Sequence, residues 1–312
     1  MKRIILTLVV LLVVAVFATA LFFYLRPIAV ITYLNRRALL QAGFAKKAIS
    51  TPFGPQTAFE AGSGPTLVFL HGAGDNAGTW AKVAPKFARR YHVVLVDLPG
   101  HGESSPAAGS LKMETVVRDL GGVLAALPCP CVVVGNSLGG WLAMVEAVNA
   151  PARVTRLVVV DGGASVGERP DLPLLVTTRE QAAKVWDAIL DPGSPRIPGF
   201  VLDDVVRQSQ QGPIGRMIAA GDMKRFLMSE EDLRRFPVPV DLLWGESDRL
   251  VPLHYAQRMQ AQLPAVRLTT VPRCGHAPQM ECPVAFSAAL EKILQQAPPA
   301  PPQDAALKEP AP

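Results

Sequence analysis

The chain has 312 residues, of which 49% are hydrophobic, and it carries a formal net charge of +5. This length can bury a large core, and a single α/β domain with an insertion fits it well. The lysines and arginines are scattered or flank the first apolar run. They form no stripe of the kind that binds nucleic acid, so membrane headgroups are the more natural anionic partner.

The first segment is apolar from Ile4 to Leu25, 22 residues without a charge. That length can cross a bilayer as a helix. We expect an uncleaved, single-pass anchor over residues 1–26, because the apolar run continues past Ala18-Thr-Ala20, the one candidate cleavage site. The alternative is a signal peptide whose removal releases a secreted or periplasmic protein. Basic residues flank both ends of the run, so orientation stays open.

Residues 27–50 interleave apolar and basic side chains. This pattern is typical of a juxtamembrane helix on the membrane surface, and it equally fits a linker helix packed on the protein body. The globular domain is expected over residues 51–296. The Ala/Pro-rich segment 297–312 has the composition of a disordered tail.

Short apolar segments then alternate with helix-like segments. This alternation predicts an α/β fold, with a mostly parallel sheet covered by helices on both faces. It stops at about residues 162–237, where prolines and helical stretches near 179–190, 201–210 and 215–228 predict a helical cap. The expected strands are 56–60, 66–70, 92–97, 131–134, 156–161, 238–244 and 266–271, and the expected helices outside the cap are 79–90, 113–127, 140–150, 254–263 and 283–296.

One turn stands out for its chemistry. The strand at 131–134 runs into Gly135-Asn-Ser-Leu-Gly139, and a helix follows. A G-x-S-x-G sequence between a strand and a helix lets the chain turn sharply and expose the serine above the sheet. We therefore predict that Ser137 is a nucleophile rather than part of a structural turn.

A serine hydroxyl needs a base to remove its proton and an acid to orient that base. Of the five histidines, His276 follows the last expected strand, where functional groups of an open parallel sheet gather. Asp248 follows the strand before it and is the predicted acid. Asp161, which ends an earlier strand, is the main rival, and Glu246 is a weaker one.

The oxyanion of such a reaction needs backbone N–H donors. We expect one from Leu138, directly after the serine, and one from Ala73 in the small-residue loop after residues 66–70. Trp141 is a candidate acyl-chain contact, although ordinary core is an equal alternative. No sequence spacing suggests a metal site, and no cofactor is expected.

Four cysteines do not define a disulfide framework in a chain of this length. Cys129 and Cys131 are too close in sequence to pair with each other. Cys274 and Cys282 bracket His276 and could pair in an oxidising compartment. Buried free thiols are the simpler expectation, because free cysteine behaves as a small hydrophobic residue.

Taken together, these segments resemble the α/β-hydrolase superfamily over about residues 55–295. The resemblance implies a Ser137–His276–Asp248 triad beneath a cap and an esterase or lipase activity on a small-molecule or lipid ester. The anchored layout is similar to membrane-anchored lipases of the monoacylglycerol-lipase type. The motifs that carry the resemblance are His71-Gly-Ala-Gly, Asp97-Leu-Pro-Gly-His-Gly-Glu-Ser, Gly135-Asn-Ser-Leu-Gly-Gly, Gly245-Glu-Ser-Asp and Gly275-His276.

Other functions remain open within this fold, because function depends on the site and not on the architecture. A serine at the nucleophile position disfavours haloalkane dehalogenases and epoxide hydrolases, which place aspartate there. A carbon–carbon bond hydrolase, an acyltransferase and a perhydrolase could use the same triad. A non-catalytic binding protein is less expected, since all three triad positions are filled.

Overall fold

The computed structural model describes residues 2–165, 172–173 and 175–300. At its centre lies one eight-stranded sheet in the order β1-β2-β4-β3-β5-β6-β7-β8. Only β2 runs opposite to the other strands. The mostly parallel sheet predicted from the alternating pattern is therefore confirmed. The strands are β1 Ala45–Thr51, β2 Gly54–Ala61, β3 Thr66–Leu70, β4 His92–Val96, β5 Cys131–Asn136, β6 Val154–Val160, β7 Val240–Gly245 and β8 Val266–Val271.

Helices cover both faces of the sheet because the central strands are apolar on both sides. In β3, Val68 and Leu70 face one core cluster, and Leu67 and Phe69 face the other. The expected helix at 79–90 is instead two short pieces, η1 and α3. The helices that flank the sheet are η1 Ala77–Trp80, α3 Ala84–Phe87, α4 Met113–Ala126, α5 Leu138–Asn149, α10 Leu253–Gln262, α11 Pro278–Glu281 and α12 Pro283–Gln295.

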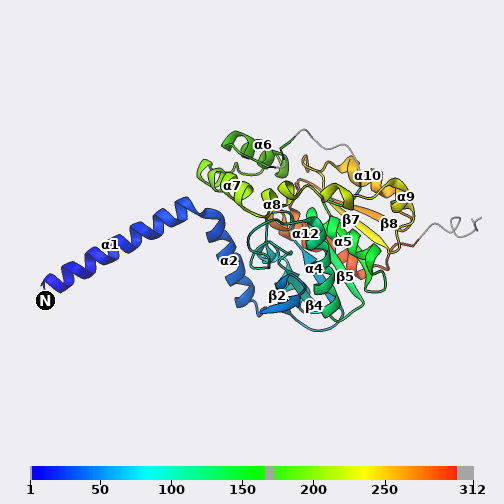
Figure 1. Cartoon of the computed structure of the whole chain (residues 1–312), viewed down its shortest axis with the longest axis horizontal. Helices are drawn as coiled ribbons and strands as arrows, with labels where there is room; N and C mark the ends of the chain where they lie inside the picture. The colour runs from blue at the N-terminus through cyan, green and yellow to red at the C-terminus, as the bar shows by residue number, and fades with distance from the viewer. Residues whose placement is uncertain (1, 166–171, 174, 301–312) are drawn as a thin grey trace, which may run out of the picture.

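The predicted helical cap lies between β6 and β7 and is visible in Figure 1 at one edge of the body. Pro198 precedes α7 and Pro213 begins α8. Proline is suited to these positions because it fixes φ and has no N–H to leave unpaired. The cap elements are α6 Arg179–Ile189, α7 Gly199–Gln211, α8 Pro213–Ala220, η2 Met223–Phe226 and α9 Glu230–Arg234.

Two helices precede the sheet. α1 (Lys2–Leu25) projects from the body (Figure 1). All of its side chains are exposed. It is the one helix in the described ranges long and apolar enough to cross a membrane. Its end contacts the cap, where Tyr24 stacks on Phe200 with ring centroids 5.3 Å apart and Arg207 donates to the Leu25 carbonyl. The apolar helix and the cap are therefore neighbours.

The second helix, α2 (Pro27–Gln41), packs on the protein body. Of the two alternatives for this segment, the structure therefore shows the packed linker helix. Leu39 is fully buried, and Arg36 forms an ion pair of 2.6 Å with buried Asp97. The sheet also begins at Ala45, inside the segment expected to be a linker. The end of the expected disordered tail, residues 301–312, lies outside the described residues.

Candidate active site

Ser137 occupies a sharp turn between β5 and α5. Its φ of 52° and ψ of −114° lie in a region that side chains other than glycine rarely adopt. The flanking glycines are required by close packing. A Cβ at Gly135 would lie 2.4 Å from the backbone of Gly139, and one at Gly139 would lie 2.4 Å from the Leu70 carbonyl oxygen. Such local strain is typical of functional sites, and the serine side chain remains half-buried.

His276 and Asp248 are brought together from the loops after β8 and β7. His276 Nδ1 lies 2.8 Å from Asp248 Oδ2, and both residues are buried. The backbone N–H groups of Leu250 and Val251 each donate to Asp248 Oδ1 at 2.8 Å, which fixes the carboxylate. An aspartate that accepts in this way assigns the ring proton of His276 to Nδ1. Nε2 is then free to accept a proton.

Asn136 connects the serine turn to the histidine loop. Its Nδ2 donates to the His276 carbonyl at 2.9 Å, and its Oδ1 accepts from Gln279 Nε2 at 3.1 Å. The residue next to Ser137 is therefore hydrogen-bonded to His276 itself, across 140 positions of sequence. The strand order alone could not have revealed this contact, because it depends on side-chain geometry.

The loop after β3 lies against the same turn, since a Cβ at Gly72 would lie 3.4 Å from Ser137 Cβ. Ala73, the expected oxyanion donor, is exposed in this loop, and Leu138, the other, is the first residue of α5. Buried His71 lies under the loop. Its Nε2 accepts from the Leu98 N–H at 2.9 Å and its Nδ1–H donates to the Gly72 carbonyl at 2.7 Å.

Burial lowers the pKa of His71 to about 4, so its ring is neutral near pH 7. A neutral ring can accept from one backbone group and donate to another at the same time. This support of the loop was not predicted from the sequence, although His71 begins the His71-Gly-Ala-Gly motif. Its position directly after an apolar strand was the available signal.

The other candidate residues lie elsewhere. Asp161 is buried at the end of β6 and accepts from the Gly245 N–H at 2.8 Å, while His276 pairs with Asp248. Glu246 accepts instead from the Thr270 hydroxyl at 2.6 Å. Trp141 is 6% exposed and belongs to the core. Its indole N–H donates to the Phe226 carbonyl at 2.8 Å, which ties α5 to the cap.

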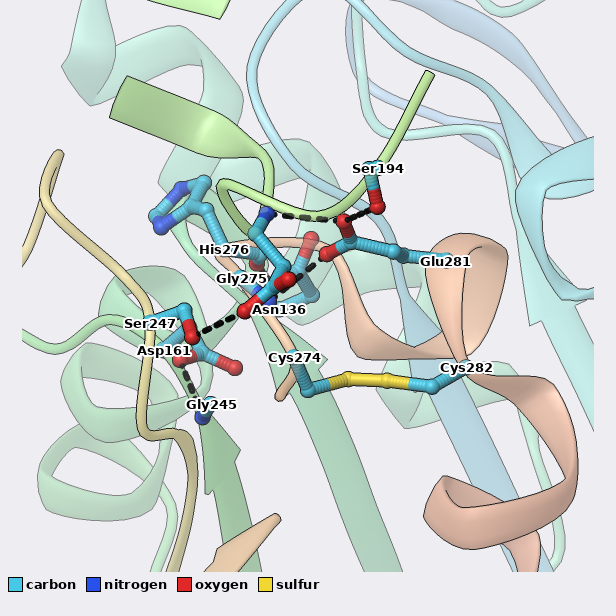
Figure 2. The surroundings of a disulfide bond; sticks show 11 residues. Asn136, Asp161, Ser194, Gly245, Ser247, Cys274, Gly275, His276, Glu281 and Cys282 are labelled. Atoms are coloured by element: carbon cyan, nitrogen blue, oxygen red, sulfur yellow. Dashed lines mark hydrogen bonds between the residues drawn. A yellow bond between two sulfur atoms is a disulfide. The ribbon is translucent and has the colours of Figure 1, made fainter. Parts of the chain in front are cut away.

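The cysteines around His276 correct the expectation of free thiols. Cys274 and Cys282 form a disulfide with Cα atoms 6.2 Å apart, and Figure 2 shows it directly below the His276 loop. A separation of eight residues lets the chain fold back around the intervening loop. Cys129 and Cys131 are not part of a disulfide.

Glu281, also within that loop, was not identified from the sequence. It accepts from the Gly275 N–H at 2.6 Å and from the Ser194 hydroxyl (Figure 2). It also accepts from the Asp191 N–H at 2.8 Å. The carboxylate thus links the residue next to His276 to the segment after α6. No sequence pattern marks this role, because its partners lie far apart in the chain.

Residues 67–289 match the alpha/beta hydrolase family, and the chain belongs to it. It is 32% identical to a pimeloyl-[acyl-carrier protein] methyl ester esterase of Nitrosomonas europaea, over 74% of this chain and 96% of the relative. It is also 32% identical to a 2-hydroxy-6-oxononadienedioate/2-hydroxy-6-oxononatrienedioate hydrolase of Cupriavidus pinatubonensis, over 71% of this chain and 84% of that relative. Among solved structures, a bacterial membrane phospholipase A matches with a TM-score of 0.75 and 27% sequence identity. The match covers 94% of this chain and 98% of the phospholipase chain.

Proposed function

We propose that this hydrolase is a membrane-anchored serine esterase that cleaves carboxylic esters with medium or long acyl chains. The observation that carries the proposal is the His276–Asp248 hydrogen bond beside the strained turn at Ser137. Ser137 Oγ attacks the ester carbonyl as His276 Nε2 takes its proton, and Asp248 holds the imidazole. The resulting acyl-enzyme is hydrolysed by water, with His276 acting again as base.

The backbone N–H groups of Leu138 and Ala73 stabilise the tetrahedral oxyanion in this mechanism. An apolar side chain of the cap lies next to them, because a Cβ at Gly74 would come within 2.9 Å of Ile214 Cδ1. Ile214 belongs to α8 and offers hydrocarbon surface where an acyl chain would leave the reacting carbon. Trp141 supports this cap from within the core.

A lipid-like substrate is supported by the position of α1. This apolar helix contacts α7 of the cap, so a membrane that holds α1 would lie near the cap. The similarity to a membrane phospholipase A points in the same direction. We infer that α1 is an uncleaved single-pass anchor. Disulfides persist on the oxidising side of a membrane, so the Cys274–Cys282 bond supports a catalytic body on that side.

The test is a p-nitrophenyl ester series of increasing acyl length on the full chain in detergent. We expect the highest activity at medium or long chains. Ser137→Ala should reduce it by about 10⁴-fold or more. Ser110→Ala, at an exposed serine, is the matched control and should leave activity unchanged. Retained hydrolysis in Ser137→Ala would refute the nucleophile assignment.

A carbon–carbon bond hydrolase is the second candidate, because a relative at 32% identity is a 2-hydroxy-6-oxononadienedioate/2-hydroxy-6-oxononatrienedioate hydrolase. The same preparation should therefore be offered a 2-hydroxy-6-oxo dienoate. Turnover of that compound with inactivity on every ester would replace the esterase proposal. Acyl transfer and perhydrolysis would appear as products other than the free acid when an alcohol or peroxide is added.

A further inference from the structure

Asp161 was considered as the triad acid, and its surroundings give it a different role. It follows β6 with a φ of 47°, a left-handed conformation that is uncommon outside glycine and that aspartate adopts more readily than most residues. Its side chain is completely buried. Oδ1 accepts from the N–H of Gly245 at 2.8 Å, as Figure 2 shows. Gly245 ends β7, three residues before Asp248, so the carboxyl bridges the ends of two neighbouring strands.

The second oxygen of Asp161 is enclosed, and no N–H or O–H donor from the described part of the chain reaches it. The neighbouring group is the Asp248 carboxyl, and both its charge and a side-chain hydrogen bond with it raise the pKa of Asp161. Two carboxyl groups can share a hydrogen bond only if one of them carries a proton. A pair of adjacent buried carboxylates would otherwise repel each other strongly.

The donor counts decide which residue holds that proton. Asp248 already accepts three donors, from Leu250, Val251 and His276, which stabilise its ionised form. Asp161 accepts only one. Burial, first, and the negative charge of Asp248, second, raise the pKa of Asp161 well above its usual value. Glu281 adds a weaker contribution in the same direction.

We propose that Asp161 is a neutral carboxylic acid whose O–H donates to the Asp248 carboxylate, and that it acts as a positioning residue for the triad. This inference rests on the proposed function for its catalytic consequence. Asp161 does not touch the reacting atoms. It supplies a fourth donor to Asp248 and so fixes the carboxylate that orients His276.

Asp161→Asn and Asp161→Ala separate this role from simple space filling. The asparagine amide can still accept from Gly245 and donate to Asp248, whereas alanine can do neither. The readout is the rate at which a fluorophosphonate labels Ser137 in the full chain in detergent. Asp161→Asn should stay within about threefold of wild type. Asp161→Ala should be about 10- to 100-fold slower, as when partners of catalytic groups are lost. Equal rates in the two variants would overturn the proposal.

Infrared spectroscopy tests the proton directly and does not depend on any substrate. The difference spectrum of wild type minus Asp161→Asn at neutral pH should contain one protonated carboxylic-acid carbonyl band, because other protonated acids cancel. A carboxylate band in its place would refute the neutral form, even if Asp161→Ala fails to fold. Should Ser137→Ala disprove the esterase mechanism, this band still decides the Asp161–Asp248 pairing separately.

Discussion

The turn that carries Ser137 and the loop that carries His276 are held in place in different ways. Ser137 is fixed by its immediate neighbours, since Gly135 and Gly139 allow β5, α5 and β3 to approach within contact distance. His276 depends on partners distant in sequence. Its backbone N–H donates to Ile189 of the cap at 2.7 Å, and its carbonyl accepts from Asn136.

This difference determines what each half of the site is sensitive to. A turn specified by backbone geometry fails when a side chain is added to it. A loop held by a disulfide and by Glu281 fails when the bonds to the cap or across the loop are removed. The two halves should therefore be separable by mutation, the first through folding and the second through a loss of activity that accompanies a smaller loss of stability.

The largest effect is expected at Gly139. In Gly139→Ala the new Cβ would lie 2.4 Å from the Leu70 carbonyl oxygen, which belongs to rigid backbone. We expect a loss of about 4 kcal/mol or more in the free energy of unfolding, or no folded protein. Chemical denaturation measures it. The control is Gly199→Ala at the start of α7, where the nearest atom is 3.5 Å away. Similar stability in both variants would contradict this account of the turn.

The serine side should also respond to pH through Glu146 of α5. Burial raises the pKa of its carboxyl from 4.5 to about 7. The folded protein then keeps a proton that the unfolded chain loses above pH 4.5. The free energy of unfolding should therefore fall by about 3 kcal/mol in total as pH rises from about 4.5 to 7. Above about pH 7 it should no longer change with pH through this group.

Glu146→Gln should remove that pH-dependent contribution. The free energy of unfolding of the variant should therefore increase relative to that of wild type as pH rises through the same window. Urea denaturation at several pH values gives the comparison. Glu114→Gln, an exposed change on α4, should leave the pH dependence as it is. A wild-type-like pH slope in Glu146→Gln would show that this carboxyl is not the titrating group.

On the histidine side, removal of the disulfide should cause the next largest loss in the free energy of unfolding. Cys274→Ser/Cys282→Ser frees the loop that carries His276, and closing a loop of this length is worth about 2.5 kcal/mol. We expect that loss of stability together with slower fluorophosphonate labelling of Ser137. The double change Cys129→Ser/Cys131→Ser should alter stability without the same loss of labelling. Unchanged labelling without the disulfide would mean that other contacts suffice to hold His276.

The same contrast explains what the sequence could predict. The parallel sheet, the cap and the turn at Ser137 follow from local patterns, namely apolar segments and closely spaced glycines. The roles of His71, Asn136 and Glu281 do not, because each depends on a partner that tertiary packing supplies. The packing of α2 on the body was also undecided at that level, since amphipathic helices suit membranes and proteins alike.

The smallest effect is expected at Glu281, whose carboxylate bridges the His276 loop and the cap. Glu281→Gln keeps one acceptor oxygen but places an amide N–H2 against the N–H of Gly275 or Asp191. Because one charge-assisted contact is lost and the fold is otherwise intact, we expect about 1–2 kcal/mol lower stability. The catalytic change should appear in kcat rather than KM, as Glu281 positions the His276 loop and has no substrate contact in the proposed mechanism. The measurement is kcat and KM for ester hydrolysis by Glu281→Gln, with Glu291→Gln on the surface of α12 as the control variant. A change confined to KM would instead place Glu281 in control of the cap.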